Sequence, residues 1–567
     1  MATKASPSKK GSSTKKGGKL VSTVALFIGV LAVGLYWVGI DSIVNGINLA
    51  LSGYSGVCDQ YPIAKPEGFN DSEFDYFNDP KYLQRSVELL GGAVRIPTET
   101  HDDMGPLGED SRWAVFDEFH KYLKESFPSI YSKFKVETVN TYNLLLTWEG
   151  SNKDLKPILY MSHQDVVTVP PDTWTQWTHP PFSGHFDGTF LHGRGSLDCK
   201  NNLIGILEAL TYLIEELDFK PQRTVLLAFG FDEEISGPYG ASQLAPFIEK
   251  RYGRDSLALI LDEGDGIHEL AGTFFAHVAT SEKGFANIRL ELHTPGGHSS
   301  VPPDHTGVGI LSEVVTDLEN KNLQKPVIDM ESPMASHLQC AGKHGKSLSL
   351  IVKSILLHLD LKPIKLLLRW KMKELFSLVA YLMTTTQAND VIVGGAKANA
   401  LPEYSYLYTN YRVANGDTLE ALNERYLKIV TGVAKKHGVG LYAFGEQLIA
   451  PTKAGYFNVT NLQPQLSPAP VSPKNDVFGK LAGAVRLTFE EFQSYPSIIV
   501  TPSLMPANTD TKFYWQLSQN IYRFAAMSGM WETKIHAVDE RVEMKEHINF
   551  IFFIQTLTRV MDTYTEI

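Results

Sequence analysis

The sequence predicts an α/β protein: a mostly parallel sheet domain, interrupted by an inserted ferredoxin-like α+β domain and preceded by one transmembrane helix. An uncharged apolar run over residues 20–40 predicts the transmembrane helix. From about residue 81, short apolar strands alternate with helices, an order typical of a parallel sheet. Between residues 283 and 460 the order becomes β-α-β-β-α-β, which is the ferredoxin-like arrangement.

The N-terminal segment is predicted to anchor the chain. Residues 1–19 carry six lysines and no acid, so we expect a disordered cytosolic tail. Residues 20–40 are long enough to span roughly 30 Å as a helix, the thickness of a bilayer core. The rest of the chain then faces a lumen or the exterior, and the sequons at Asn70 and Asn458 are predicted glycosylation acceptors there. A signal peptide is the alternative, and it has the same consequence.

The remaining sequence divides into a stalk and two interleaved domains. Pro, Gly and Asp punctuate the stalk, residues 41–80. The sheet domain covers residues 81–282 and resumes at 461–567. The inserted domain, 283–460, contains an apolar and basic segment at 330–388. We expect that segment to be a helical insertion that packs on its own domain; contact with a membrane surface is the alternative.

Composition excludes two classes of protein. The net charge of the 567 residues is −11 and the pI is near 5.9, so nucleic acid is not expected as a partner. The three cysteines, Cys58, Cys199 and Cys340, form no CxxC pair and no Cys/His run. One disulfide is allowed, but a disulfide scaffold is not.

Acids and histidines stand where the predicted strands end. "MSHQDVV" places His163 and Asp165 two residues apart, on one face of a strand. "GRGSLDCKNN" places Asp198 in a loop before a helix, and "FGFDEE" ends a strand on Glu233 and Glu234. Strand ends are where sheets of this class place their sites.

Two more polar segments complete the pattern. "LDEG" offers Asp262 and Glu263, and "KIHAVDERV" offers His536. Histidines and carboxylates without thiolates suit Zn²⁺, Mn²⁺ or Co²⁺. A shared carboxylate can bridge two such ions, and a glutamate next to a ligand can serve as a general base. The sequence therefore predicts a centre with one or two divalent cations.

Five motifs together carry a family resemblance: "SHQDVV", "GRGSLDCKNN", "DEEISG", "LDEG" and "HTPGGHSSVPP". Over residues 80–567 the chain resembles the co-catalytic zinc metallopeptidase family of aminoacylase, bacterial glutamate carboxypeptidase and succinyl-diaminopimelate desuccinylase. Within that family it looks most like the membrane-anchored vacuolar branch of fungal carboxypeptidase S and the animal relatives that hydrolyse N-acyl amino acids.

The resemblance implies two Zn²⁺ ions per chain. The implied ligands are His163, Asp198, Glu234, Asp262 and His536. Asp198 would bridge the two ions. Which of the two ions Glu234 would bind is left undecided. Either acid of "LDEG" can ligate, and we favour Asp262. His547 is the alternative to His536, although it stands in a helix-like apolar run.

The resemblance also implies roles for residues beside the metals. Glu233 would be the general base and Asp165 would orient His163. The peptide bond Asp198–Cys199 is expected to be cis. His298 would stabilise the oxyanion, unless it is an ordinary turn histidine.

Asn399 and Arg412 resemble positions that grip a substrate carboxylate, for which a guanidinium is suited. Arg412 could equally be a strand-surface charge. The inserted domain is expected to close over the cleft as a lid, and a homodimer through the lid domain is left open.

The predicted function is that of a zinc carboxypeptidase that cleaves the amide bond next to a free C-terminal carboxylate in peptides. The expected location is a single-pass membrane protein with its catalytic part in the vacuole or the secretory lumen. An N-fatty-acyl amino acid hydrolase is the alternative, with residues 330–388 lining an acyl tunnel. An inactive anchored scaffold is the third reading, disfavoured because no ligand is visibly lost.

Overall fold

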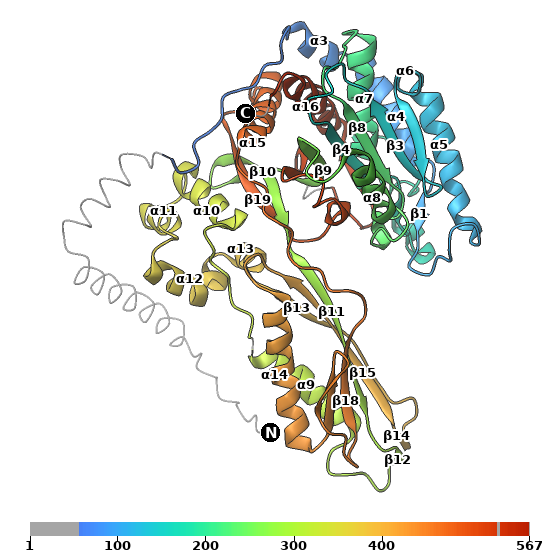
Figure 1. Cartoon of the computed structure of the whole chain (residues 1–567), viewed down its shortest axis with the longest axis vertical. Helices are drawn as coiled ribbons and strands as arrows, with labels where there is room; N and C mark the ends of the chain where they lie inside the picture. The colour runs from blue at the N-terminus through green and yellow to red at the C-terminus, as the bar shows by residue number, and fades with distance from the viewer. Residues whose placement is uncertain (1–55, 322, 530–532, 566–567) are drawn as a thin grey trace, which may run out of the picture. The chain divides into compact units, whose positions relative to one another are not determined.

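The larger domain is built around a mixed eight-stranded sheet (Figure 1). The computed structural model describes residues 56–321, 323–529 and 533–565. Residues 60–567 form one unit, and 1–59 form another. The sheet has the order β19-β10-β20-β9-β4-β8-β3-β2. Its strands are β2 Lys135–Val139, β3 Asn143–Trp148, β4 Ile158–His163, β8 Val225–Gly230, β9 Leu259–Leu270, β10 Thr273–Glu282, β19 Ile498–Met505 and β20 Ile521–Ser528.

The sheet is less parallel than its apolar strands suggest. β4 runs parallel to β8 and β9, β9 to β20, and β10 to β19. β3 is antiparallel to β2 and β8, and β10 is antiparallel to β9 and β20. The expectation of a mostly parallel sheet is therefore wrong toward both edges of the sheet, at β2–β3 and at β10. The sequence could not show this, because strands buried on both faces are apolar whichever way they run. The central β8-β4-β9 strands, which carry the polar ends, are parallel as expected.

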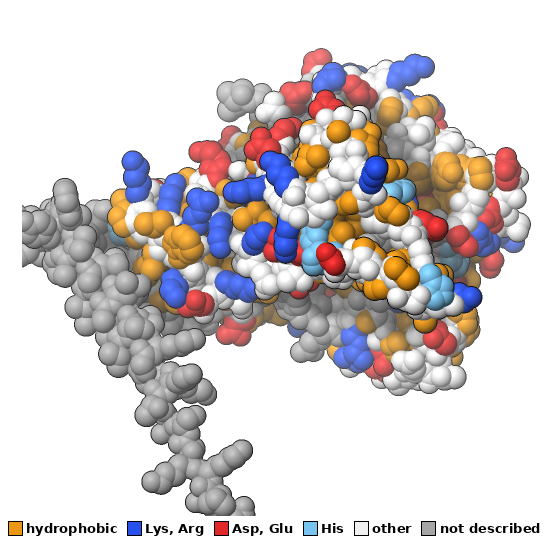
Figure 2. Space-filling model, turned by 90° about the horizontal axis from the view of Figure 1, so that it is seen from below, with side chains coloured by type: hydrophobic (Ala, Val, Ile, Leu, Met, Phe, Trp, Pro, Cys, Tyr) orange, Lys and Arg blue, Asp and Glu red, His pale blue; other side chains and the backbone are white. Residues whose placement is uncertain are grey.

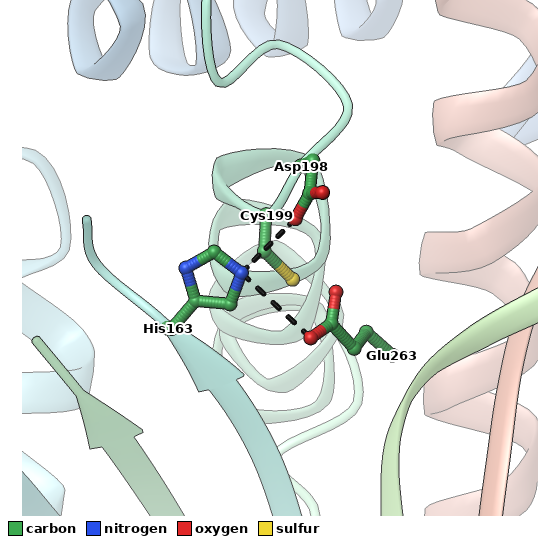
Figure 3. Close-up of side chains that lie close together, drawn as sticks. All are labelled: His163, Asp198, Cys199 and Glu263. Carbon is green, nitrogen blue, oxygen red and sulfur yellow. Dashed lines mark hydrogen bonds and ion pairs between the residues drawn. The ribbon is translucent and has the colours of Figure 1, made fainter. Parts of the chain in front are cut away.

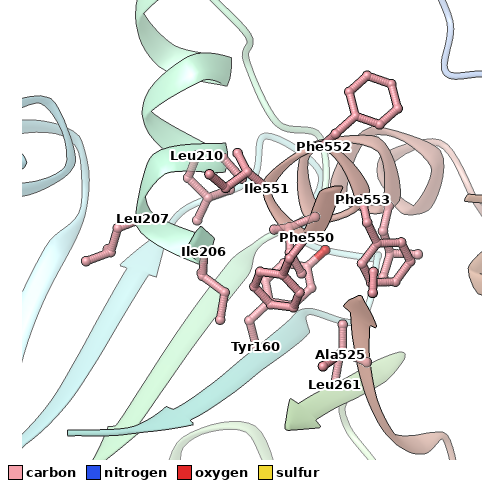
Figure 4. Close-up of a cluster of buried hydrophobic side chains, with 14 of the residues drawn as sticks. Tyr160, Ile206, Leu207, Leu210, Leu261, Ala525, Phe550, Ile551, Phe552 and Phe553 are labelled. Atoms are coloured by element: carbon pink, nitrogen blue, oxygen red, sulfur yellow. The ribbon is translucent and has the colours of Figure 1, made fainter. Parts of the chain in front are cut away.

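Helices cover both faces of this sheet. They include α4 Pro80–Val94, α5 Val115–Ser126, α7 Lys200–Glu215, α8 Ala241–Tyr252, α15 Asp476–Arg486 and α16 Met544–Asp562. Side chains alternate between the faces with period two: Tyr160 of β4 packs with α7 and α16, while Leu159 packs with α8. Figure 4 shows the first cluster, where Phe550 and Phe553 of α16 meet Tyr160 and Leu261 of the sheet.

The predicted stalk is in part a component of the larger domain. Helix α3, Ser72–Asn78, contributes Phe77, which is 1% exposed in the main core. The backbone N–H of Ala64 donates to the carbonyl of Gly483 at 3.1 Å. The boundary at residue 80 is therefore too late, because the apolar residues between the turn-forming ones are core residues. Residues 41–55 lie outside the described part.

The smaller domain has a six-stranded sheet of order β13-β15-β11-β18-β16-β17. Its strands are β11 Gly284–His293, β13 Thr386–Gly394, β15 Tyr404–Val413, β16 Gly440–Ala443, β17 Glu446–Ile449 and β18 Tyr456–Asn461. Helices α9, Gly307–Lys321, and α14, Leu419–His437, pack on it through one hydrophobic cluster. The order β11-α9-β13-β15-α14-β18 matches the predicted ferredoxin-like pattern, with the β16–β17 hairpin as an addition.

The 330–388 segment is helical, as expected, but it does not pack only on its own domain. It contains α10 Pro333–His344, α11 Leu350–Leu357, α12 Lys362–Leu375 and α13 Ser377–Leu382. Helix α10 packs against β10 and β19 of the larger domain. Leu350 and Trp370 are 73% and 66% exposed. The face in Figure 2 likewise carries Lys and Arg side chains beside hydrophobic ones.

The expected single-pass location needs a correction. Among the residues that the structure describes, no helix has the length and apolar character needed to cross a bilayer. The basic tail, 1–19, and the predicted anchor, 20–40, lie outside the described residues.

Candidate metal centre

The first group of site residues forms where β4 and β9 reach the same edge of the sheet. His163 is the last residue of β4, and its Nε2 lies 3.0 Å from Oδ1 of Asp198. The same nitrogen lies 3.7 Å from Oε1 of Glu263, on β9 (Figure 3). β4 and β9 run parallel and pair over Ile158–Tyr160 and Leu259–Leu261, so His163 and Glu263 both lie just beyond the paired stretch and come close together.

The second group shares Asp198 with the first. Nε2 of His536 lies 3.1 Å from Oδ2 of Asp198 and 3.3 Å from Oε2 of Glu234. In each group the candidate ligand atoms all lie within 4.8 Å of one another. The two oxygens of Asp198 therefore face two different histidines, as a carboxylate between two cations would.

Glu263, and not Asp262, belongs to this cluster. Neighbouring residues of a strand point to opposite faces, so only one of the two acids can face His163. Asp262 is 5% exposed, stands opposite Arg523 of β20, and is absent from both ligand groups. The structure thus favours Glu263 over Asp262 as the acid that faces His163, because "LDEG" alone does not say which face of β9 looks toward β4, and Asp262 as a ligand stays an untested prediction.

Asp165 holds three parts of the site in place. It is fully buried, and its Oδ1 lies 3.2 Å from Nδ1 of His163. The backbone N–H groups of Glu233 and Glu234 donate to its two oxygens, both at 3.1 Å, and the hydroxyl of Thr100 donates at 2.8 Å. The carboxylate thus orients the imidazole of His163 and fixes the η3 turn, Glu233–Ile235, that carries Glu233 and Glu234.

Glu540 is a site residue that sequence reasoning did not find. Its Oε1 accepts backbone N–H groups of Gly195, Leu197 and Asp198 at 2.9, 3.1 and 3.3 Å. Its other oxygen forms a buried ion pair with Arg194. Glu540 therefore fixes the loop that carries Asp198. Its position four residues after His536 was the available signal.

Cys199 lies beside the cluster but is not expected to bind metal. It is buried and free, and the hydroxyl of Ser162 lies 3.1 Å from its sulfur. Burial raises the pKa of the Cys199 thiol, so the thiolate that a metal requires is disfavoured. The Asp198–Cys199 bond is cis, as the resemblance implied.

The electrostatics of the cluster call for a cation. Burial raises the pKa of Glu234 to about 7 and that of Glu263 to about 8, and the charge of Asp198 adds to both. Burial, and then Glu263, also raise the pKa of Glu233. Hydrogen bonds to Asp198 and Glu234 raise the pKa of His536 to about 10. The crowded carboxylates therefore favour the protonated form of the histidine that contacts them, His536.

The donor set fits divalent cations. It supplies imidazole nitrogens and carboxylate oxygens, which suit Zn²⁺. Oε1 of Glu234 is buried and has no hydrogen-bond partner within the described part of the chain, so a ligand position is available.

The residues predicted to touch substrate lie in the smaller domain. Nδ1 of His298, on β12 (Gly297–His298), lies 2.7 Å from the Ser300 hydroxyl, and His298 is exposed. Asn399 is exposed as well. Arg412, on β15, donates to Oδ1 of Asn508 at 3.3 Å and is partly buried. Among the described residues, none of the three has a hydrogen bond or ion pair to either group of candidate ligands.

Three further predicted positions have ordinary surroundings. His547 is buried on α16, where its ring nitrogens face Asn201 and Glu208 at 2.6 and 3.1 Å, so it is a core residue. Asn70 is exposed. The amide of Asn458 donates to Glu291 at 3.0 Å within the small sheet. Glycosylation at Asn70 and Asn458 stays a prediction.

Comparison with known proteins places the chain in a family. Carboxypeptidase S of Saccharomyces cerevisiae is 40% identical over 515 residues, which cover 88% of this chain and 88% of that protein. N-fatty-acyl-amino acid synthase/hydrolase PM20D1 of Homo sapiens is 31% identical over 489 residues, covering 84% and 88%.

Solved structures and a family model agree with these matches. Human carnosine dipeptidase 1 aligns with a TM-score of 0.58 at 12% identity, over 88% of this chain and 100% of that one, which speaks for the fold alone. The model of Peptidase family M20/M25/M40 matches residues 159–559, a segment that contains both ligand groups. The chain therefore belongs to Peptidase family M20/M25/M40 and is a hydrolase of the metallopeptidase class.

Proposed function

We propose that this chain is a zinc-dependent carboxypeptidase that hydrolyses the amide bond next to the free C-terminal carboxylate of a peptide. The main observation behind this proposal is the position of Asp198 between two histidines. Its Oδ1 lies 3.0 Å from Nε2 of His163, and its Oδ2 lies 3.1 Å from Nε2 of His536. This arrangement supports two Zn²⁺ ions per chain. The 40% identity to carboxypeptidase S favours peptides as substrates.

Five residues would hold the two ions: His163, Asp198, Glu234, Glu263 and His536. Zinc at such a site supplies Lewis-acid charge and makes water more acidic near neutral pH. Asp165 and Glu540 would act through their hydrogen bonds, by holding the ligands in the required orientation.

Glu233 is the proposed general base. It takes a proton from the attacking water as the water oxygen bonds to the carbonyl carbon. It then gives that proton to the amine nitrogen as the carbon–nitrogen bond breaks. Burial and the charge of Glu263 raise the pKa of Glu233.

Substrate recognition is proposed for the smaller domain. Arg412 would pair with the terminal carboxylate, since the fork geometry of a guanidinium suits a carboxylate. Asn399 and His298 would reach the substrate, His298 at the oxyanion, only when the smaller domain closes toward the cluster.

The decisive experiment compares Glu233→Gln with Glu249→Gln, a partly exposed glutamate of α8, in hydrolysis of blocked dipeptides. We expect Glu233→Gln to keep its metal but to lose several orders of magnitude in kcat, and the control to keep both. Activity retained in Glu233→Gln would exclude the assigned role.

An N-fatty-acyl amino acid hydrolase is the second candidate, because one relative at 31% identity bears that name. Parallel assays of a blocked dipeptide and an N-oleoyl amino acid separate the two: a higher kcat/KM for the oleoyl compound would reverse the proposal. Failure to hydrolyse either would favour an inactive scaffold.

A further inference from the structure

A second group of metal-ligating side chains lies apart from the proposed catalytic residues. Oδ1 of Asp265 lies 2.5 Å from Nε2 of His268, and its Oδ2 lies 3.1 Å from Nδ1 of His277. The imidazole rings of the two histidines are 4.9 Å apart. One candidate ligand atom from each of the three residues lies within 4.8 Å of the others.

The backbone brings these residues together through the β9–β10 hairpin. Asp265 and His268 belong to β9, and His277 to β10, its antiparallel neighbour. Helix α10 packs against β10 and brings His337 to this place, with its ring centre 4.7 Å from that of His277. Strands β9 and β10 and helix α10 thus each place at least one of these side chains at the same position in the fold.

Hydrogen bonding within the group does not satisfy all of its nitrogens. Nε2 of His277 and Nδ1 of His337 are buried, and neither has a hydrogen-bond partner among residues 56–321, 323–529 and 533–565. His337 is only 5% exposed. Unpartnered buried nitrogens are costly, and each such group needs an explanation. A cation close to these imidazole rings is one explanation.

The geometry repeats that of the proposed catalytic centre. There, too, one aspartate places each of its oxygens within about 3 Å of a different histidine, as Asp198 does with His163 and His536. We propose that Asp265, His268 and His277 hold a divalent transition-metal ion, Zn²⁺ by their ligand chemistry, next to His337. Two imidazoles and one carboxylate are a common zinc set, with a fourth position left for water or a further side chain.

The position of the group suits a structural ion. The side chains of Asp265, His268 and His277 are 30%, 11% and 16% exposed, so an ion can enter from solvent without opening the core. It would join β9 to β10 beside the first helix of the 330–388 insertion. No residue is shared with the catalytic cluster, so the two sites can be emptied separately.

Metal analysis of the full chain tests the proposal. After dialysis against metal-free buffer, His268→Ala/His277→Ala should hold one zinc equivalent less than the unaltered chain and should still hydrolyse substrate. His437→Ala is the matched control, because His437 is 4% exposed and pairs with a single carboxylate, Glu313, at 2.9 Å. Equal zinc content in the double variant and the unaltered chain would overturn the proposal.

Crystals of the unaltered chain provide a test that needs no variant. An anomalous difference map at the zinc edge should show a peak between Asp265, His268 and His277. If the peaks at Asp198 appear and this one does not, the second site is excluded, whatever the stability of the variants. A peak here without activity would leave the proposal intact while the proposed function fails.

Discussion

Replacing Asp165 by asparagine tests whether one buried carboxylate organises the centre. The aspartate accepts hydrogen bonds from the backbone of Glu233 and Glu234 and from the Thr100 hydroxyl, and its Oδ1 lies 3.2 Å from His163 Nδ1. Asparagine has the same shape but only one acceptor oxygen. Its amide group must therefore face at least one backbone N–H, and the charge that orients His163 is lost.

The cost follows from those contacts. If the amide turns toward Thr100, the hydroxyl can reverse its role, but the N–H of Glu234 stays buried without a partner, at about 1–3 kcal/mol. Two remaining hydrogen bonds become neutral rather than charge-assisted, which adds roughly 1 kcal/mol. We expect a loss of about 2–4 kcal/mol in the free energy of unfolding. Metal affinity or kcat/KM should fall roughly 10- to 100-fold.

Urea unfolding, zinc content and dipeptide hydrolysis measure the three effects. Thr100→Val is the matched control, since it removes one donor to Asp165 and leaves the carboxylate in place. It should cost about 1 kcal/mol in stability and leave metal binding unchanged. If Asp165→Asn matched Thr100→Val in zinc content and kcat/KM, the orienting role of Asp165 would be refuted.

Three further substitutions probe other parts of the molecule. Glu540→Gln leaves Arg194 buried without a counter-charge, so the free energy of unfolding should fall by about 3–5 kcal/mol and zinc retention should weaken. Urea unfolding and metal analysis measure these two effects. An unchanged free energy of unfolding and an unchanged zinc content would count against the prediction. Phe550→Ala should cost about 3–5 kcal/mol in urea, because its ring is 2% exposed in the core, and a loss below 1 kcal/mol would contradict that packing. Burial, with a smaller contribution from Arg412, lowers the pKa of Lys283 from 10.5 to about 8. Between these two pH values the unfolded chain binds the proton and the folded chain does not. The free energy of unfolding should therefore rise with pH by up to about 3 kcal/mol relative to Lys283→Met. The same pH dependence of this free energy in both chains would argue against the prediction.

Much of the site could be predicted because each ligand follows a recognisable local pattern. His163 ends an apolar strand, Glu234 lies in the short turn that follows another, and Asp198 precedes a long helix. Parallel β4 and β8 then bring their polar ends to one edge. The same reasoning located His536 only through a family motif, because its loop has no regular periodicity.

The errors arose where the answer depends on non-local geometry. Whether Asp262 or Glu263 faces His163 depends on the register of β9, which shifts against β20. Strand direction at the outer parts of the sheet has no signature in residues buried on both faces. Glu540 could not be assigned from the sequence, because its partners are backbone groups of a loop more than three hundred residues earlier.

His536 and Glu540 follow the loop of Asp198 by more than three hundred residues, which has a consequence for synthesis. A nascent chain that ends before them has the loop of Asp198 but neither the histidine facing it nor the carboxylate that fixes it. Peptide-cleaving capacity should therefore arise only after both residues have been synthesised, and products that terminate before them should lack it.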